Sequence, residues 1–270
     1  MVSRTIIRTN KELTEIYNNL KRGDIIVGTI GIKRSEEFKF LDLAERGILM
    51  FPSALSQMAT RSKTMQGLLF NEYMVEHTFV ARGRRDLIEN IKVYNINNID
   101  RVVTKQERQN CGVGVNLWNS LEEVYTQASL NSINYPFVVQ PFIADLIDIR
   151  VVVLGEYLEA YQRLNKYNFR QNLYFGGEPI HLFVQSEDSL QLTSNLQPTS
   201  PQKIADLCKR VMERGKFPWA HVDVVTVGGG RVYLSEISLH GNLHGSRIGR
   251  EEYLKKINSL TESFLKSYQE

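Results

Sequence analysis

A valine-rich hairpin with charged ends is the feature that most constrains this chain. The segment DIRVVVLGEYLEAYQR, residues 148–163, alternates as two strands around a turn at Gly155 and Glu156. With a two-residue turn, Asp148 lies opposite Arg163, and the period of two places Arg150 on the same face. The two guanidinium groups and one carboxylate form either a cross-strand ion pair with one unpaired positive charge, or an anion site that the carboxylate orients. The pattern alone favours the ion pair, because most such pairs are structural.

A second hairpin is predicted in HVDVVTVGGGRVYLSEIS, residues 221–238. Gly229 and Gly230 suit the centre of a two-residue turn, since both positions accept positive φ, and this register pairs Asp223 with Glu236. Like charges opposite each other destabilise a sheet, so the pair indicates either a shared cation or a raised pKa. A hard cation such as Mg²⁺ prefers these oxygen ligands. The alternative is a register slip by one residue, which would send the two side chains to opposite faces.

Polar residues continue beyond this hairpin in the segment ISLHGNLHGSRIGR. It offers Ser238, His240, Asn242 and His244 in a chain interrupted by glycines. Glycine disfavours a helix, so a helical pair of histidines that binds a metal is not expected. We interpret the segment as a loop that lines a substrate site.

A glycine-containing loop follows a lysine in KQERQNCGVGV. Lys105 ends a predicted strand, and Gly112 and Gly114 open the next one. Glycines let backbone N–H groups approach an anion closely, so the loop is compatible with phosphate binding. The loop is neither GxxxxGK[ST] nor a GxGxxG strand-to-helix turn, and on this motif alone a plain hairpin loop is the alternative.

The whole chain has the pattern of a mixed α/β protein. Residues 1–60 form a short α/β unit, in which a helix opened by the capping box of Thr9 and Glu12 precedes a strand, a helix and a strand. A long helical stretch is predicted over residues 55–73, and strands and turns dominate from about Ile99. The helix after Pro201 carries an apolar stripe, which predicts that it packs on a core.

Composition excludes several classes of protein. Hydrophobic residues make up 42% of the 270 residues and the net charge is +3, which indicates a folded core and gives no ground for a nucleic-acid partner. The two cysteines, Cys111 and Cys208, lack the spacing of a disulfide framework or a zinc site. The N-terminus has no apolar run of signal-peptide length, and no segment approaches the roughly 18 apolar residues of a membrane span. We therefore expect a cytoplasmic protein that does not associate with membranes.

Taken in chain order, six motifs resemble those of an ATP-grasp ligase. They are most similar to the branch of ribosomal-protein glutamate ligases and glutathione synthetases. Each motif alone is unspecific, whereas all of them in family order at family-like spacing are a strong signal. The resemblance covers about residues 52–245 and rests on RSKTMQ with Lys63, Lys105 with CGVGV, VVQPFI, DIR at 148–150, FRQNLYFGG at 169–177, and VDVV followed by SEIS.

The resemblance implies an ATP-grasp fold over residues 61–270, with a small lid at about 75–137 and a larger catalytic part at 138–270. It also implies roles for individual residues. ATP would be bound by Lys63, Lys105, Gly112, Gly114, the hinge residues Gln140, Pro141, Phe142 and Ile143, and Asp145 at the ribose. The acyl substrate and the transferred phosphate would be bound by Arg150, Arg163, Arg170 and Asn172. Mg²⁺ or Mn²⁺ would be held by Asp223 and Glu236.

Three departures from the family pattern affect these roles. The third metal ligand is usually an asparagine two residues after the glutamate, and this position is Ser238. Either Ser238 suffices, Asn242 substitutes for it, or one metal is bound loosely. The phosphate flap has Gln109 and Asn110 where the family has an early glycine, and the N-terminal unit is shorter than the usual first domain, which helps to bind the acceptor.

The activity expected from the resemblance is that of an ATP-dependent carboxylate–amine ligase. A carboxylate attacks the γ-phosphate and an amine captures the acylphosphate, while the protein positions the groups and neutralises charge. The partners would be a small-molecule or peptide acyl donor, such as an amino acid or a peptide, and an amine acceptor, and a homo-oligomer is compatible with the sequence. An ATP-grasp kinase and a degenerate nucleotide-binding module without turnover are the alternatives.

Overall fold

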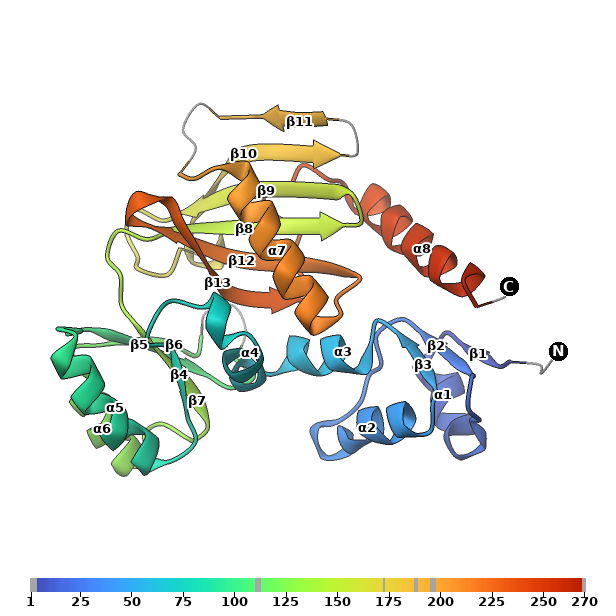
Figure 1. The fold of residues 1–270 in the computed structure, drawn as a ribbon, viewed down its shortest axis with the longest axis horizontal. Coiled ribbons are helices and arrows are strands. Elements are labelled where there is room, and N and C mark those ends of the chain that lie inside the picture. The colour runs from blue at the N-terminus through green and yellow to red at the C-terminus, as the bar shows by residue number, and fades with distance from the viewer. Residues whose placement is uncertain (1–3, 110–112, 172, 187–188, 195–197, 269–270) are drawn as a thin grey trace.

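Three sheets organise the described part of the chain (Figure 1). The computed structural model describes residues 4–109, 113–171, 173–186, 189–194 and 198–268. The sheets have the strand orders β1-β2-β3, β4-β7-β5-β6 and β11-β10-β9-β8-β12-β13. Within the described ranges, no helix combines the length and the apolar content that crossing a membrane requires. The predicted mixed α/β fold is confirmed.

The N-terminal unit is a small parallel sheet with helices beside it. The fully buried strand β2 (Ile25–Val27) pairs in parallel with both β1 (Ile6–Ile7) and β3 (Leu49–Phe51). Thr9 and Glu12 form the predicted capping box at the start of α1. The helical elements of the unit are α1 (Asn10–Ile16), α2 (Phe38–Glu45) and the short 3-10 helices η1 (Tyr17–Asn19) and η2 (Arg34–Glu36).

The stretch predicted as one long helix is two helices. The helix α3 (Ala54–Arg61) stops at Ser62, whose extended backbone has φ −133° and ψ 110°, and α4 (Lys63–Leu69) begins directly after it. The Ser62 hydroxyl accepts a hydrogen bond from the N–H of Met65 at 3.0 Å. This cap satisfies a donor that has no partner within the helix and is the local reason for the break.

The smaller antiparallel sheet, which we call the lid sheet, is covered by two helices on one face. Its strands are β4 (Phe79–Ala81), β5 (Val102–Gln106), β6 (Val115–Trp118) and β7 (Phe137–Pro141). The helices α5 (Arg84–Ile96) and α6 (Leu121–Ser129) pack on it, and the 3-10 helix η3 (Asn71–Tyr73) precedes β4. Leu87 and Tyr94 of α5 meet Leu121 and Val124 of α6 in a separate core.

The six-stranded antiparallel sheet, which we call the large sheet, is crossed on one face by α7 (Pro201–Gly215) (Figure 1). The apolar stripe of α7 is buried as predicted, including Ile204, Leu207 and Val211. The strands are β8 (Ile147–Leu154), β9 (Tyr157–Leu164), β10 (Glu178–Ser186), β11 (Ser189–Leu192), β12 (Trp219–Val227) and β13 (Arg231–Ser238). The 3-10 helices η4 (Leu173–Phe175) and η5 (Gly228–Gly230) lie in its connections.

The first predicted hairpin has the register expected from the sequence. Gly155 and Glu156 connect β8 to β9, and Gly155 takes the positive φ, 63°, that this turn requires. Asp148 therefore lies opposite Arg163. The period of two then places Arg150 on the same face, as predicted.

The second hairpin reaches the predicted pairing by a different route. Three glycines, Gly228–Gly230, form the turn, so the prediction of a two-residue turn is wrong. This longer turn alone would set Asp223 opposite Ser235. A β-bulge inserts Ser235 as an extra residue in β13, and Asp223 pairs with Glu236.

The helix α8 (Arg250–Lys266) connects the large sheet to the N-terminal unit. Near its start, the Tyr253 hydroxyl lies 3.0 Å from His221 Nε2 of β12. Near its end, Phe264 stacks on Phe51 of β3 with the ring centroids 4.5 Å apart, and Leu265 is buried in the small core beneath β2. A helix far along the chain therefore completes the packing of the first strands.

Candidate active site

Four charged residues on three adjacent strands form a buried network. Arg150 binds Asp223 in bidentate geometry, with Nε 2.7 Å from Oδ1 and Nη2 2.8 Å from Oδ2. Arg163 lies 2.6 Å from Asp148 Oδ1 through Nε and 3.0 Å from Asp223 Oδ2 through Nη2. The register explains these contacts, because Asp223 is the cross-strand neighbour of Arg150, and Asp148 is that of Arg163. The first hairpin was interpreted either as a cross-strand ion pair or as an anion site. The ion pair is present, and its arginines also line a cavity.

The pKa values of the two aspartates shift in opposite directions. Burial opposes ionisation of Asp223, but the charges of Arg150 and Arg163 hold its pKa well below the usual range. Burial raises the pKa of Asp148, and the nearby Asp223 charge adds to this effect against the attraction of Arg163. Asp223 is therefore a firmly ionised carboxylate, and the raised pKa that the paired carboxylates suggested does not occur at this residue.

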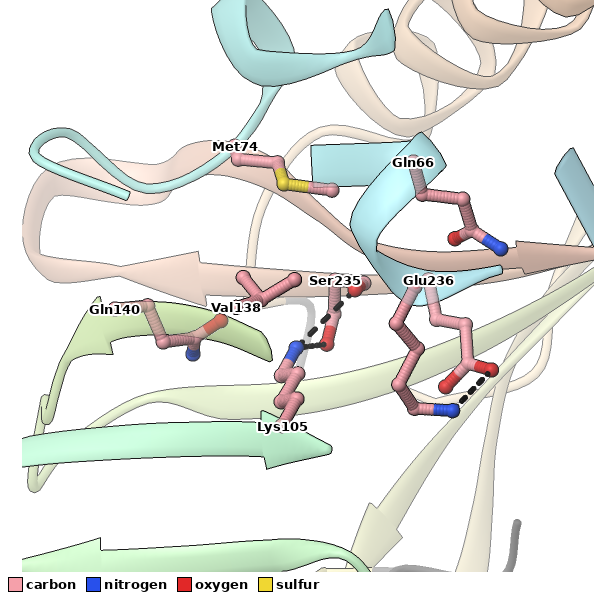
Figure 2. A pocket seen from close by; sticks show the side chains of 8 residues that line it. Gln66, Met74, Lys105, Val138, Gln140, Ser235 and Glu236 are labelled. Carbon is pink, nitrogen blue, oxygen red and sulfur yellow. Dashed lines mark hydrogen bonds and ion pairs between the residues drawn. The ribbon is translucent and has the colours of Figure 1, made fainter. Parts of the chain in front are cut away.

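Two lysines contact β13, and Figure 2 shows Lys105 directed at Ser235. Lys63 Nζ lies 3.2 Å from Glu236 Oε1 and donates to the backbone oxygen of Gln109 at 2.8 Å. Lys105 Nζ donates to the backbone oxygen and the hydroxyl of Ser235, at 3.2 and 3.0 Å. The bulge therefore both sets the carboxylate register and supplies the acceptors for Lys105. Burial lowers the pKa of Lys105, although the charge of Glu236 opposes the shift.

The donor set fits a magnesium ion that is bound together with phosphates. Within the described residues, no group of three or more histidine, cysteine or acidic side chains is placed to hold a metal. Mg²⁺ is usually bound by one or two carboxylates, water and substrate phosphates, and Asp223 and Glu236 supply that number. The Ser238 hydroxyl accepts from the N–H of His240 at 3.1 Å, and the side-chain oxygen of Asn242 accepts from the N–H of His244 at 2.9 Å.

A cavity of about 1,090 Å³ joins these groups. Most of the predicted site residues line it, namely Lys63, Lys105, Gln140, Phe142, Ile143, Arg150, Arg163, Arg170, Asp223, Glu236, Ser238 and Asn242. Among the described residues, Pro141, Asp145 and Gly114 are not in its lining, and Gly112 and Asn172 lie outside the described residues. The roles assigned to all of these residues stay predictions.

Contacts within the protein already engage part of the hinge, residues 140–143, and part of the phosphate flap around Gly114. The N–H of Phe142 donates to the backbone oxygen of Arg101 at 2.9 Å, and Pro141 has no N–H, so neither offers a backbone donor to adenine. Gly114 packs so closely on Gln109 that an added Cβ would lie 2.4 Å from the Cβ of Gln109. Arg170 Nε donates to the backbone oxygen of Val115 at 3.0 Å, which connects the segment after β9 to the lid sheet.

The loop after β13 is held on the large sheet by Glu159. This carboxylate is fully buried on β9 and accepts hydrogen bonds from the Ser246 hydroxyl at 2.6 Å, from the N–H of Arg247 at 2.5 Å and from the N–H of Ile248 at 3.2 Å. The interpretation of this segment as a lining loop agrees with the cavity, to which it contributes His240, Asn242 and His244.

Solved structures match the chain along most of its length, whereas no protein-family model and no curated protein matches it. D-alanyl-alanine synthetase A from Vibrio cholerae O1 biovar eltor str. N16961 has a TM-score of 0.56 at 12% identity, over 88% of this chain and 77% of its own. The ATP-grasp ligase PsnB, complexed with precursor peptide PsnA2 and AMPPNP, has a TM-score of 0.56 at 11% identity, over 90% and 79%. The chain has the ATP-grasp fold. N5-carboxyaminoimidazole synthetase from Staphylococcus aureus, complexed with ADP, has a TM-score of 0.58 at 10% identity, over 88% of this chain and 59% of its own.

Several cavity residues receive no role from the sequence motifs, among them His221, Phe169 and Arg61. His221 precedes Asp223 by two residues on β12, so the period of two could have placed it on the same face. Its imidazole is buried, which lowers its pKa to about 4, and it is therefore neutral at neutral pH. Phe169 stands beside the predicted Arg170. Arg61 carries no local signal, because the helix break that orients it depends on the cap at Ser62.

Proposed function

We propose that the protein is an ADP-forming carboxylate–amine ligase that joins an amino acid or a peptide to an amine through an acylphosphate. One observation carries the proposal: five predicted cations line a single cavity beside the paired carboxylates Asp223 and Glu236. Such a surface suits a nucleotide triphosphate and a second anion. The order of the sequence motifs supports the branch of ribosomal-protein glutamate ligases and glutathione synthetases.

Nucleotide binding would exchange internal contacts for phosphate contacts. Lys63 would move its charge from Glu236 to a phosphate, and Lys105 is already directed into the same pocket (Figure 2). Asp223 and Glu236 would hold Mg²⁺, with Ser238 or Asn242 as a neutral third ligand. When bound, this ion neutralises the charge of the phosphate oxygens during transfer.

Arg150 and Arg163 would position the acyl carboxylate and the phosphate that it receives. Both guanidinium groups are already oriented by buried carboxylates, so little reorganisation is needed as charge moves. The acyl carboxylate attacks the γ-phosphorus and ADP leaves. The amine then attacks the acyl carbon, the C–N bond forms, and phosphate leaves with the C–O bonding electrons.

We further propose that three segments of the chain have different roles. Residues 1–60 would contribute to the site of the second substrate, residues 75–137 would act as the lid, and residues 138–270 would supply the catalytic sheet. The proposed ligase activity, together with two cysteines that lack the spacing of a disulfide framework, supports a location in the cytoplasm.

Product analysis tests the proposal. The protein would be supplied with ATP and Mg²⁺, a panel of carboxylic acids and a panel of amines, and the products would be identified by mass spectrometry. A ligase forms ADP, phosphate and an amide only when both an acid and an amine are present. A phosphorylated hydroxyl compound would indicate a kinase instead, and nucleotide binding without turnover would indicate a degenerate module.

A matched pair of variants tests the site within the same assay. Glu236→Gln is expected to abolish turnover while the protein stays folded, because it removes one of two carboxylates available to Mg²⁺. Glu251→Gln makes the same change at an exposed position of α8 and should leave turnover unaltered. Full activity of Glu236→Gln would contradict the assignment of this residue to the metal.

A further inference from the structure

Arg61 presents a fixed guanidinium group to the cavity at the end of α3. Its Nη1 donates to the backbone oxygen of Ile32 at 2.8 Å, and its Nη2 donates to that of Ile30. The guanidinium carbon lies over the ring of Phe40, 5.3 Å from the centroid. A guanidinium group has five N–H donors, so three donors are left for a ligand once these two contacts are made.

The charge of Arg61 is not neutralised by a contact. Within the described ranges, Arg61 forms no ion pair, and the Glu37 carboxylate beside it is engaged by Arg108 at 2.7 Å. The carboxylate next to Arg108 in the chain, Glu107, accepts from the N–H of Thr64 at 2.9 Å. Burial lowers the pKa of Arg61, although Glu37 opposes the shift, and an arginine stays charged at neutral pH nonetheless. A partly buried charge without a counter-ion is costly, so this position is suited to an anion from solution.

Arg61 lies beside the chain that follows β13. The hydroxyl of Thr60 accepts from the N–H of Leu239 at 3.0 Å, which ties the end of α3 to the chain just past β13. The next residue, His240, has its pKa lowered by burial and by the charge of Arg61, so the two side chains are neighbours. Among the described residues, the cations in ion pairs with Asp223 and Glu236 are Arg150, Arg163 and Lys63. Arg61 therefore faces a different part of the cavity lining, beside His240.

The surrounding chain also favours a ligand at this place. Ile30 and Ile32 belong to the loop that follows β2, at the carboxyl end of the parallel N-terminal strands. Open α/β sheets bind ligands outside this end of their strands. The cavity lining as a whole carries seven lysine and arginine residues against three carboxylates, which suits a further anion beyond a nucleotide bound with Mg²⁺.

We propose that Arg61, beside His240, binds a substrate carboxylate other than the one that ATP activates. This inference rests on the proposed ligase function and deepens it. The second substrate is then an amino acid or a peptide with a free carboxylate, rather than a simple amine. The planar fork of arginine matches a carboxylate with two parallel hydrogen bonds.

Calorimetry on the intact protein saturated with AMPPNP and Mg²⁺ tests this subsite. The probes are the free amino acids, their carboxamides and their N-acetyl derivatives. At least one free amino acid should bind, and its carboxamide should bind at least about 10-fold more weakly, the scale of one lost charge-assisted contact. The N-acetyl derivative lacks the attacking amine, so it should bind more weakly than the free amino acid. Equal binding of the two would assign the carboxylate to the acyl donor and would contradict the inference.

Variants separate Arg61 from the rest of the cavity. Arg61→Gln should lower the affinity for the free amino acid by at least about 10-fold. The affinities for the carboxamide and for AMPPNP should keep their wild-type values. Arg61→Lys should show an intermediate loss, and the exposed Arg250→Gln should show none.

Two results would overturn the inference. Equal binding of acid and carboxamide to the wild-type protein, or the absence of any amino acid binding, would remove the carboxylate subsite while leaving nucleotide binding intact. Wild-type affinity of Arg61→Gln for the free amino acid would do the same. If AMPPNP itself does not bind, the proposed function fails, and this inference fails with it.

Discussion

Replacing Arg163 with methionine is expected to destabilise the protein by about 3–5 kcal/mol at pH 7, the cost of breaking a buried ion pair from one side. Arg163 is 6% exposed and contacts both Asp148 and Asp223. Methionine fills much of the space but carries no charge. Asp223 keeps its bidentate contact with Arg150, whereas Asp148 loses its closest partner. The loss is therefore concentrated on Asp148.

The pH dependence identifies Asp148 as the source of this loss. Burial already raises the pKa of Asp148, and removing Arg163 raises it further. A carboxyl group whose pKa is higher in the folded than in the unfolded state destabilises folding most strongly above its folded pKa. This penalty begins to shrink as pH falls through the folded pKa and is gone below the unfolded pKa. The difference between variant and wild type should therefore shrink on acidification.

A double-mutant cycle measured by urea unfolding provides the assay. Asp148→Asn leaves a neutral side chain that needs no counter-ion, so Arg163→Met should cost about 1–3 kcal/mol less in that background. The exposed Arg250→Met is the matched control and should fall within about 0.5 kcal/mol of wild type. A cost below about 1 kcal/mol for Arg163→Met, or additive effects in the cycle, would refute the reasoning. The turnover of the double variant, Arg163→Met with Asp148→Asn, then distinguishes a structural ion pair from a phosphate site. If Arg163 binds the phosphate, the double variant is inactive even when it is folded.

Three further perturbations test other parts of the structure. Lys105→Ala should weaken ATP binding about 10- to 100-fold in calorimetry, since a charge-assisted contact is worth about 1.5–3 kcal/mol; unchanged affinity in the folded variant would remove Lys105 from the nucleotide site. Gly241→Ala should destabilise by about 1–3 kcal/mol in urea unfolding, because the added Cβ would lie 2.3 Å from Nδ1 of the buried His221. The control Gly249→Ala has no atom within 4 Å of the added Cβ, and an equal effect of both substitutions would contradict this account. Glu159→Gln should raise KM for the second substrate more than KM for ATP, because Glu159 holds the loop beside the cavity; steady-state kinetics with both constants unchanged would rule out a positioning role.

The pairing of Asp148 with Arg163 could be predicted from the sequence because it depends on local quantities. Strand alternation has a period of two, and a two-residue turn fixes which residues face each other. The capping box of Thr9 and Glu12 is local in the same sense, since the cap and its partner are three residues apart. The ATP-grasp fold itself was accessible through motif order, although no single motif specified it.

The partners of the site residues were decided by the tertiary structure. The bulge at Ser235 corrects a turn that is one residue longer than predicted, so the correct pairing of Asp223 with Glu236 did not follow from the predicted turn. Asp223 is held by Arg150 because β12 lies next to β8 in the sheet, and Lys63 meets Glu236 across 173 positions of sequence. Strand order, bulges and such contacts result from packing of distant segments, and alternation along one strand carries no information about which strand lies beside it.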